Sequence, residues 1–134
     1  MPMATESSSC ILAPISIGEL IDKITILEIK CTNLRGDALS NTQKELELLQ
    51  GCLNASGICA KPELTRELKE VNQELWRIED RIREQESQQD FGKLFISLAR
   101  AVYKTNDRRS AIKKSINLEC GSPIVEEKSY SNYQ

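Results

Sequence analysis

Histidine is absent from this chain of 134 residues, and aromatic residues are scarce: one tryptophan, three tyrosines and two phenylalanines. Without histidine, neither a Ser-His-Asp triad nor a Cys-His nucleophile pair can form. The five cysteines contain no C-x-x-C pair. Neither histidine ligands nor closely spaced cysteine ligands are therefore present for a zinc site. No glycine-rich phosphate loop occurs either. We therefore expect no metal site and no cofactor.

Long apolar runs are also missing, since none approaches the roughly 20 residues of a membrane span. Residues 1–9 carry no basic residue ahead of an apolar stretch, as a secretory signal would. A net charge of -2 argues against a general nucleic-acid partner, because phosphate binding needs surplus Lys and Arg. An odd cysteine count opposes a disulfide framework. These features predict a cytoplasmic protein with no membrane and no nucleic-acid partner.

Few aromatics with many Leu, Ile, Glu and Lys residues favour helices over sheets. The chain length is that of one domain. We predict an all-α antiparallel helical bundle built on a long hairpin of the third and fourth helices. Residues 1–13 are predicted to be a flexible N-terminal arm, 14–122 the helical bundle domain and 123–134 a C-terminal tail that either docks on the bundle or is loose.

Capping signals bound the first two helices. Ser16 is the predicted N-cap of the first helix, with Glu19 at N3 completing a capping box. Gly36 is the predicted C′ glycine that ends it. Ser40 and Gln43 predict a second capping box before a short helix over 41–53. The first helix is apolar on more than one side, as a central or interface helix would be.

The third and fourth helices are longer. Pro62 suits the first turn of a helix over 62–88, which has one narrow apolar stripe. Asp90 is the predicted N-cap of a helix over 91–118, and Gly121 with Pro123 stops it. Either this last helix continues or Asn106 begins a separate short helix. The unbroken four-three spacing of its seam favours the continuous or kinked version.

Two charges interrupt the apolar pattern. Glu28 lies within the apolar arc of the first helix, and Arg109 falls on the seam of the last. A buried charge is costly unless paired, so we expect these two side chains to form an ion pair with each other. The pair is either part of a ligand pocket or a structural polar layer that fixes register, and the structural interpretation is favoured. The full predicted ligand-binding set is Glu28, Arg100, Tyr103, Asn106 and Arg109.

Other charged and aromatic positions have a structural and a functional interpretation. Trp76 either packs inside the chain or, with Ile26 and Ile29, forms a dimer interface. The basic stripe of Lys93, Arg100 and Lys104 could receive an anion, although solvated helix charge is the usual explanation. An E-x-x-E pair at 67 and 70 is read as surface charge, because the second acidic pair of an Mg²⁺ site is missing.

Several sequence strings occur together: PISIGELIDKITILEIK at 14–30, LARAVY at 98–103, ND at 106–107 and IVEEKSY at 124–130. In this combination the chain resembles an uncharacterised, domain-of-unknown-function family of short helical proteins from bacteria and marine cyanophages. That resemblance implies no activity. The segment 20–24 also looks like the opening of the long first helix of chorismate mutases, which bind a dicarboxylate with several Arg and Lys side chains. Here that helix offers only Lys23, Lys30 and Arg35 and lacks the early arginine.

Two function hypotheses follow. The first is a non-enzymatic interaction or assembly module that forms a homodimer, supported by the heptad seams and the missing catalytic motifs. The alternative is a protein or enzyme that binds a small anionic metabolite in a polar pocket of the bundle, in the manner of chorismate mutases. Convergence of Glu28 and Arg109 in an open cleft favours the second hypothesis, and a fully satisfied buried pair favours the first.

Overall fold

The computed structural model describes residues 10–133, which contain four helices and no strand. The helices are α2 (Ile17–Asn33), α3 (Gly36–Ser56), α4 (Pro62–Ser87) and α5 (Lys93–Cys120). The prediction of an all-α fold is confirmed. Most of the predicted N-terminal arm, residues 1–9, lies outside the described residues. Within those residues, no helix is both long enough and apolar enough to cross a bilayer.

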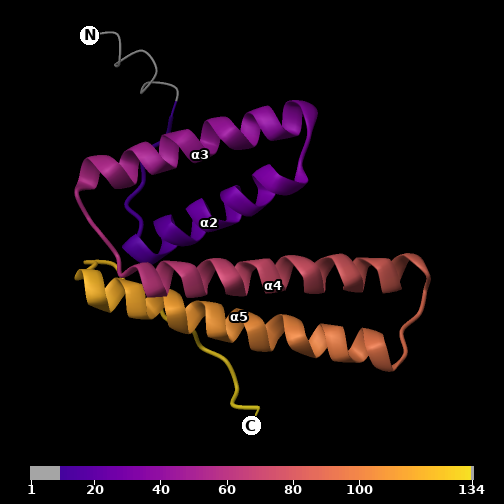
Figure 1. The fold of residues 1–134 in the computed structure, drawn as a ribbon. Coiled ribbons are helices and arrows are strands. Elements are labelled where there is room, and N and C mark those ends of the chain that lie inside the picture. Colours follow the sequence, from indigo (N-terminus) through magenta and orange to yellow (C-terminus); the bar gives the residue numbers. More distant parts are fainter. Residues whose placement is uncertain (1–9, 134) are drawn as a thin grey trace.

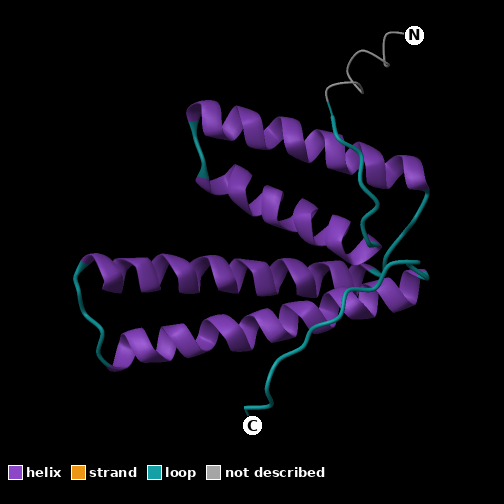
Figure 2. Cartoon of the chain, turned by 180° about the vertical axis from the view of Figure 1, so that it is seen from behind, coloured by secondary structure: helices purple, strands orange, loops and turns teal. Residues whose placement is uncertain are grey.

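The helices form two stacked pairs (Figure 1). In one pair α2 lies against α3, and in the other α4 lies against α5. Helix α2 contacts all three other helices, which explains why it is apolar on several sides. Seen from behind, the segment after α5 turns back across the helices before it reaches the C-terminus (Figure 2).

Helices α4 and α5 lie side by side, and the connection over 88–92 joins them at one end (Figure 1). Two interhelical ion pairs define how they align. Lys61, directly before α4, lies 3.4 Å from Glu119 near the end of α5. Midway along the pair, Arg108 Nη1 lies 3.1 Å from Glu74 Oε2. The last turn of α5 therefore lies beside the start of α4.

The apolar core lies where the start of α2 meets the start of α4 and the end of α5. Ile21, Leu68, Val71 and Ile116 are buried there, and Leu68 and Ile116 have no exposed surface. Burying such a side chain contributes about 1.5–3 kcal/mol. The stripe predicted on the third helix is confirmed, since its buried apolar residues include Leu75 and Ile78.

Three predicted helix boundaries are confirmed. Ser16 caps α2, because its Oγ accepts a hydrogen bond from the Glu19 backbone N–H at 3.0 Å. Pro62 is the first residue of α4. Gly121 ends α5 with a φ of 67°, in the left-handed region that glycine adopts without strain. Helix α5 is also continuous through Asn106, so a separate short helix there is wrong.

Other predicted boundaries are wrong. Gly36 begins α3 instead of ending the first helix, whose C-cap is Leu34. The positive φ of Gly36 serves the sharp reversal between α2 and α3. Because α3 starts there, Ser40 lies inside the helix and caps nothing. The N-cap of α5 is Gly92, and Asp90 stabilises the turn before it by accepting the Gly92 N–H at 3.2 Å.

Candidate functional site

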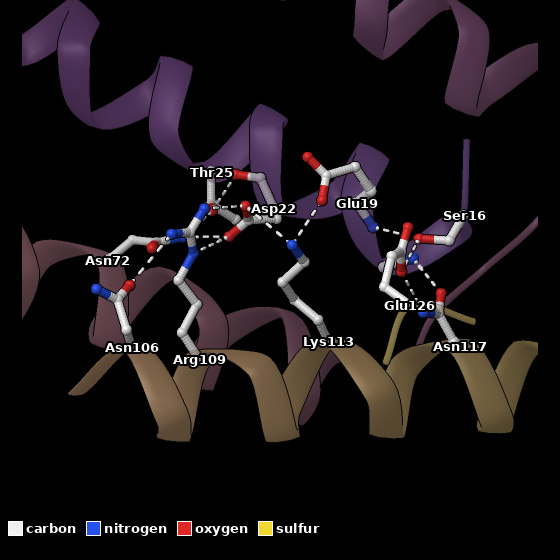
Figure 3. Close-up of polar contacts among 11 residues, drawn as sticks. Ser16, Glu19, Asp22, Thr25, Asn72, Asn106, Arg109, Lys113, Asn117 and Glu126 are labelled. Atoms are coloured by element: carbon white, nitrogen blue, oxygen red, sulfur yellow. Dashed lines mark hydrogen bonds and ion pairs between the residues drawn. The ribbon is translucent and has the colours of Figure 1, made fainter. Parts of the chain in front are cut away.

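A line of polar side chains runs between α2 and α5 (Figure 3). We call it the polar seam, and it has three parts: Asp22 with Thr25, Asn72, Asn106 and Arg109; Glu19 with Lys113; and Ser16 with Asn117 and Glu126. The α5 members point toward α2, whose acidic side chains meet them (Figure 3). Two cations from one helix therefore face two acids from another.

Asp22 is the centre of the seam and has no exposed surface. Its Oδ1 accepts hydrogen bonds from Arg109 Nε at 3.0 Å and from Asn72 Nδ2 at 2.9 Å. Its Oδ2 accepts from Arg109 Nη2 at 2.5 Å, so the guanidinium binds both carboxylate oxygens. Asn72 Nδ2 also donates to Thr25 Oγ1 at 2.9 Å. Every oxygen of the buried carboxylate is therefore paired.

This pairing controls the pKa values of both groups. Burial alone would raise the pKa of Asp22, but the hydrogen bonds from Arg109 and Asn72, with the charges of Arg109 and Lys113, outweigh it and lower the pKa. The hydrogen bond to Asp22 raises the pKa of Arg109, although burial opposes this. Both groups are thus held in their charged forms.

Lys113 and Glu19 form the second part of the seam. Lys113 Nζ lies 2.5 Å from Glu19 Oε2 and 3.8 Å from Asp22 Oδ2. Both side chains are mostly buried, with 18% and 28% of their surface exposed. An ion pair at this depth is screened less than one at the surface. Lys113 therefore bridges two acids on successive turns of α2.

The third part joins the start of α2 to α5 and the C-terminal segment. Ser16 Oγ donates to Glu126 Oε1 at 2.8 Å, and Asn117 Nδ2 donates to the same oxygen at 3.2 Å. Asn117 Oδ1 accepts the Gly18 backbone N–H at 2.6 Å. Burial raises the pKa of Glu126, but the bonds from Ser16 and Asn117 overcome this and lower it.

Gly18 allows this close approach of two helix backbones. A Cβ at that position would lie 2.5 Å from the Lys113 carbonyl oxygen and 2.9 Å from Asn117 Oδ1. The first contact is with backbone, which cannot rotate away. Glycine is therefore required here by packing, and Ser16, two residues earlier, supplies the helix cap.

The seam has little room for a ligand. A hollow beside Lys113, Asn117 and Glu126 measures about 50 Å³, room for only a few water molecules. Within residues 10–133, no seam atom is buried without a hydrogen-bond partner. Because the buried Asp22 carboxylate is fully hydrogen-bonded, this arrangement favours a structural polar layer. The seam joins α2 to α4 and α5 through these polar contacts.

The expected partner of Arg109 was the wrong acid. Glu28 lies 3.3 Å from Lys69 on α4, and 33% of its side chain is exposed. Six residues at 100° each place Glu28 about 120° around α2 from Asp22. Of these two acids, only Asp22 therefore faces α5. Glu19, Asp22 and Thr25, spaced by three, mark this polar face in the sequence and could have identified it.

The four members of the predicted ligand-binding set that lie on α5 divide between two of its faces. Asn106 and Arg109 belong to the seam, where Arg109 Nη1 donates to Asn106 Oδ1 at 3.4 Å. Arg100 and Tyr103 lie on the opposite, exposed side. Of the predicted interface residues, Ile29 is buried within the single chain at 5% exposure, whereas Ile26 and Trp76 are half-buried.

The exposed side of α5 carries a basic groove, which we call the outer groove. One hollow of about 530 Å³ is lined by the following residues: Arg100, Tyr103, Lys104, Asp107, Arg108, Ala111 and Tyr133. A second hollow of about 390 Å³ shares Arg100 and Lys104 and adds Lys93, Ile96 and Ser97. Its lining side chains are largely exposed, so the groove is open to solvent along its length.

The cations of the outer groove differ from those of the seam in having few partners. Within residues 10–133, Lys93, Arg100 and Lys104 form no ion pair. Arg108 reaches Glu74, but 61% of its side chain is exposed. Exposed ion pairs of this kind contribute little to stability. These cations are free to meet an outside anion.

The C-terminal segment lies over one end of this groove. The ring of Tyr133 packs edge-on against Tyr103, with centroids 5.1 Å apart. The Tyr133 hydroxyl donates to Asp107, and this bond raises the pKa of Tyr133 to about 12. Lys114 Nζ lies 2.8 Å from Glu127 Oε1. The tail thus docks on α5 through an acid and an aromatic ring.

A scan against protein families places these features in a family. The family model matches residues 11–133, which include the polar seam and the outer groove. The chain belongs to a family of unknown function, DUF6165. The resemblance to an uncharacterised family is thereby confirmed. Searches of curated proteins and of solved structures each returned no match.

In this chain, residues 10–133 contain no group of three acidic or thiol side chains placed to hold a metal ion. Glu67 and Glu70 line a hollow together with Glu74, but Arg77 and Arg108 line it too. All five cysteines are free thiols. The outer groove is the candidate functional site, because three of its cations, Lys93, Arg100 and Lys104, are exposed and form no ion pair within the described residues.

Proposed function

We propose that the protein is a non-enzymatic interaction module whose outer groove binds extended acidic segments of partner proteins. The observation that carries the proposal is the row of unpaired cations on α5, Lys93, Arg100 and Lys104, beside exposed Ile96 and Tyr103. Cations next to apolar and aromatic surface suit a chain that carries both acids and side chains to pack. An open groove suits a polymer better than a small ligand, which is usually mostly enclosed.

The chain's own tail supports this partner chemistry. Glu127 reaches Lys114 and Tyr133 packs on Tyr103, so an acidic and aromatic peptide already lies on α5. A net charge of -2 makes a nucleic acid the less suitable occupant, since the remaining surface repels a polyphosphate. An acidic protein segment needs only a local basic surface.

The proposal is tested with the full chain and a fluorescent poly-glutamate peptide of about ten residues. Its extended length of about 33 Å exceeds the roughly 22 Å from Lys93 to Arg108 along α5. We expect fluorescence anisotropy to show binding that weakens as salt rises. Replacing Arg100 and Lys104 by alanine should weaken the affinity about tenfold, because two exposed charge contacts contribute about 0.7 kcal/mol each.

The matched control is Lys44→Ala, which removes an exposed lysine from α3. It should leave the affinity unchanged, and all variants should unfold within about 0.5 kcal/mol of the parent chain. Equal affinity of the Arg100 and Lys104 variant would overturn the proposal, as would the absence of binding at low salt. Tighter binding of an RNA oligomer than of poly-glutamate would also overturn the proposal, because the groove would then be a nucleic-acid site.

The binding of a small anionic metabolite is the second candidate, and one observation favours it. The hollow of about 530 Å³ has the volume of a metabolite site, and the predicted ligand residues Arg100 and Tyr103 line it. A thermal-shift screen against phosphorylated sugars, nucleotides and dicarboxylates tests this, because a ligand of the native state raises its stability. Chorismate-mutase-like chemistry would need inward cations, and Arg109 and Lys113 are paired with Asp22 and Glu19.

Several sequence predictions are kept as proposals. The homodimer rests on half-buried Ile26 and Trp76, because Ile29 is enclosed by its own chain. Light scattering by the purified chain measures it directly. An antiparallel α4–α5 hairpin within a domain of 14–122, a tail of 123–134, a cytoplasmic location and a bacterial or phage origin complete this picture.

A further inference from the structure

The segment after α5 has two parts that are held very differently. Near its start, Glu126 accepts hydrogen bonds from Ser16, which is fully buried, and from Asn117, which is 1% exposed. At its other end, Tyr133 is held by one hydrogen bond to Asp107 and one ring contact with Tyr103. The first part is anchored in the polar seam and the second lies on the surface.

Between these parts the tail bridges a hollow on α5. This hollow of about 250 Å³ is lined by α5 residues on one side and by Glu126, Glu127, Lys128 and Tyr130 of the tail on the other. The segment touches α5 through side chains at intervals and leaves space beneath it. Its surface end can therefore lift without disturbing the anchor at Glu126.

Tyr133 lines the same hollow as Arg100, Lys104 and Arg108. Its ring covers part of Tyr103, the aromatic surface on which a partner would pack. Its hydroxyl donates a hydrogen bond to the carboxylate of Asp107, which also lines the groove. An acidic segment that enters the groove must compete with Tyr133 for this space.

We infer that the surface end of the C-terminal segment is an internal competitor for the outer groove, displaced when an acidic segment binds. This inference rests on the proposed function, because it concerns the same groove. Glu126 holds the tail on the molecule while Tyr133 lifts, so displacement is local and reversible. Binding to the open form alone makes the apparent affinity lower by the open fraction.

The experiment compares the parent chain with Tyr133→Ala, Tyr133→Phe and the control Tyr130→Ala in the poly-glutamate binding assay. Tyr133→Ala should bind about fivefold more tightly, because the open fraction rises toward one. Tyr133→Phe keeps the ring but loses the bond to Asp107, so its affinity should lie between. Tyr130, which is 60% exposed, should be neutral when replaced.

A second measurement follows the tail directly. With 3-fluorotyrosine in the full chain, ¹⁹F NMR should show the Tyr133 resonance moving to its free-peptide position on addition of poly-glutamate. An unmoved resonance with equal affinity of all variants would overturn the competitor while leaving the groove's binding intact. Weaker binding by Tyr133→Ala would make Tyr133 part of the binding surface, which also overturns it. If no variant binds, the proposed function fails first and the competitor with it.

Discussion

The inner face of α5 presents Arg109 and Lys113 to α2, and the outer face of the same helix presents Arg100 and Lys104 to solvent. The inner cations meet Asp22 and Glu19 at 2.5 Å. The outer cations meet no acid within residues 10–133. Both faces carry two cations within two turns, so residue type and spacing alone do not separate them.

The difference between the faces is one of burial and partners. An inner cation is needed for stability, because removing it would leave a carboxylate without its ion-pair partner between the helices. An outer cation keeps its hydration, and an incoming anion can replace that water. A buried charge pair is therefore evidence of architecture in this molecule, and the proposed binding surface lies where the charges are unpaired.

The sharpest way to break the comparison is to remove one inner cation. Arg109→Ala should lower the free energy of unfolding by about 3–5 kcal/mol, because Asp22 stays buried without its bidentate partner. The control Arg108→Ala removes the next arginine, whose pair with Glu74 is exposed, and should cost only about 0.2–1 kcal/mol. Urea unfolding measures both. Similar losses for the two variants would show that the seam is not a buried layer.

A smaller effect is expected from closing the gap between the two backbones. In Gly18→Ala the added methyl meets the Lys113 carbonyl oxygen, and we expect a loss of about 1–3 kcal/mol from overpacking. The control is Gly51→Ala in α3, where a Cβ meets nothing within 4 Å. It should gain about 0.5–1 kcal/mol from helix propensity. A gain in both variants would mean that α2 does not approach α5 so closely.

The pH dependence should be the most modest effect and distinguishes the inner acid from surface acids. Because the folded-state pKa of Asp22 is lowered, its contribution to stability is full above its ordinary pKa of about 3.9 and is lost as the pH falls through the lowered value. The unfolding free energy should therefore fall in acid. In Asp22→Asn that part of the acid dependence should vanish in parallel pH titrations, and an unchanged profile would contradict the pairing.

The sequence was sufficient to predict the four helices, because each has a periodic apolar stripe, but it gave only some of their ends correctly. Ser16, Pro62 and Gly121 are residues whose backbone or side-chain chemistry fits one position at a helix end. Gly36, by contrast, fits two positions. A positive φ suits both the end of one helix and a reversal into the next, and the preceding periodicity does not distinguish them.

The sequence also singled out Arg109 but not its partner. A search for charges among apolar positions finds Glu28, whereas Asp22 lies on a stripe with Glu19 and Thr25 that looks like a solvated face. Only the complementary stripe on α5, 87 residues later, turns that face inward. Periodicity reports how one helix is built, and it carries no information on which distant helix lies opposite.

The order in which the chain is made gives the polar seam a further consequence. Asp22 leaves the ribosome 87 residues before Arg109, a delay of roughly 4–17 s at about 5–20 residues per second. The delay for Ser16 is longer still, because its partner Glu126 is synthesised 110 residues later. During synthesis α2 therefore has its buried face open to water, and nascent chains halted before α5 should be the species that chaperones and proteases recognise.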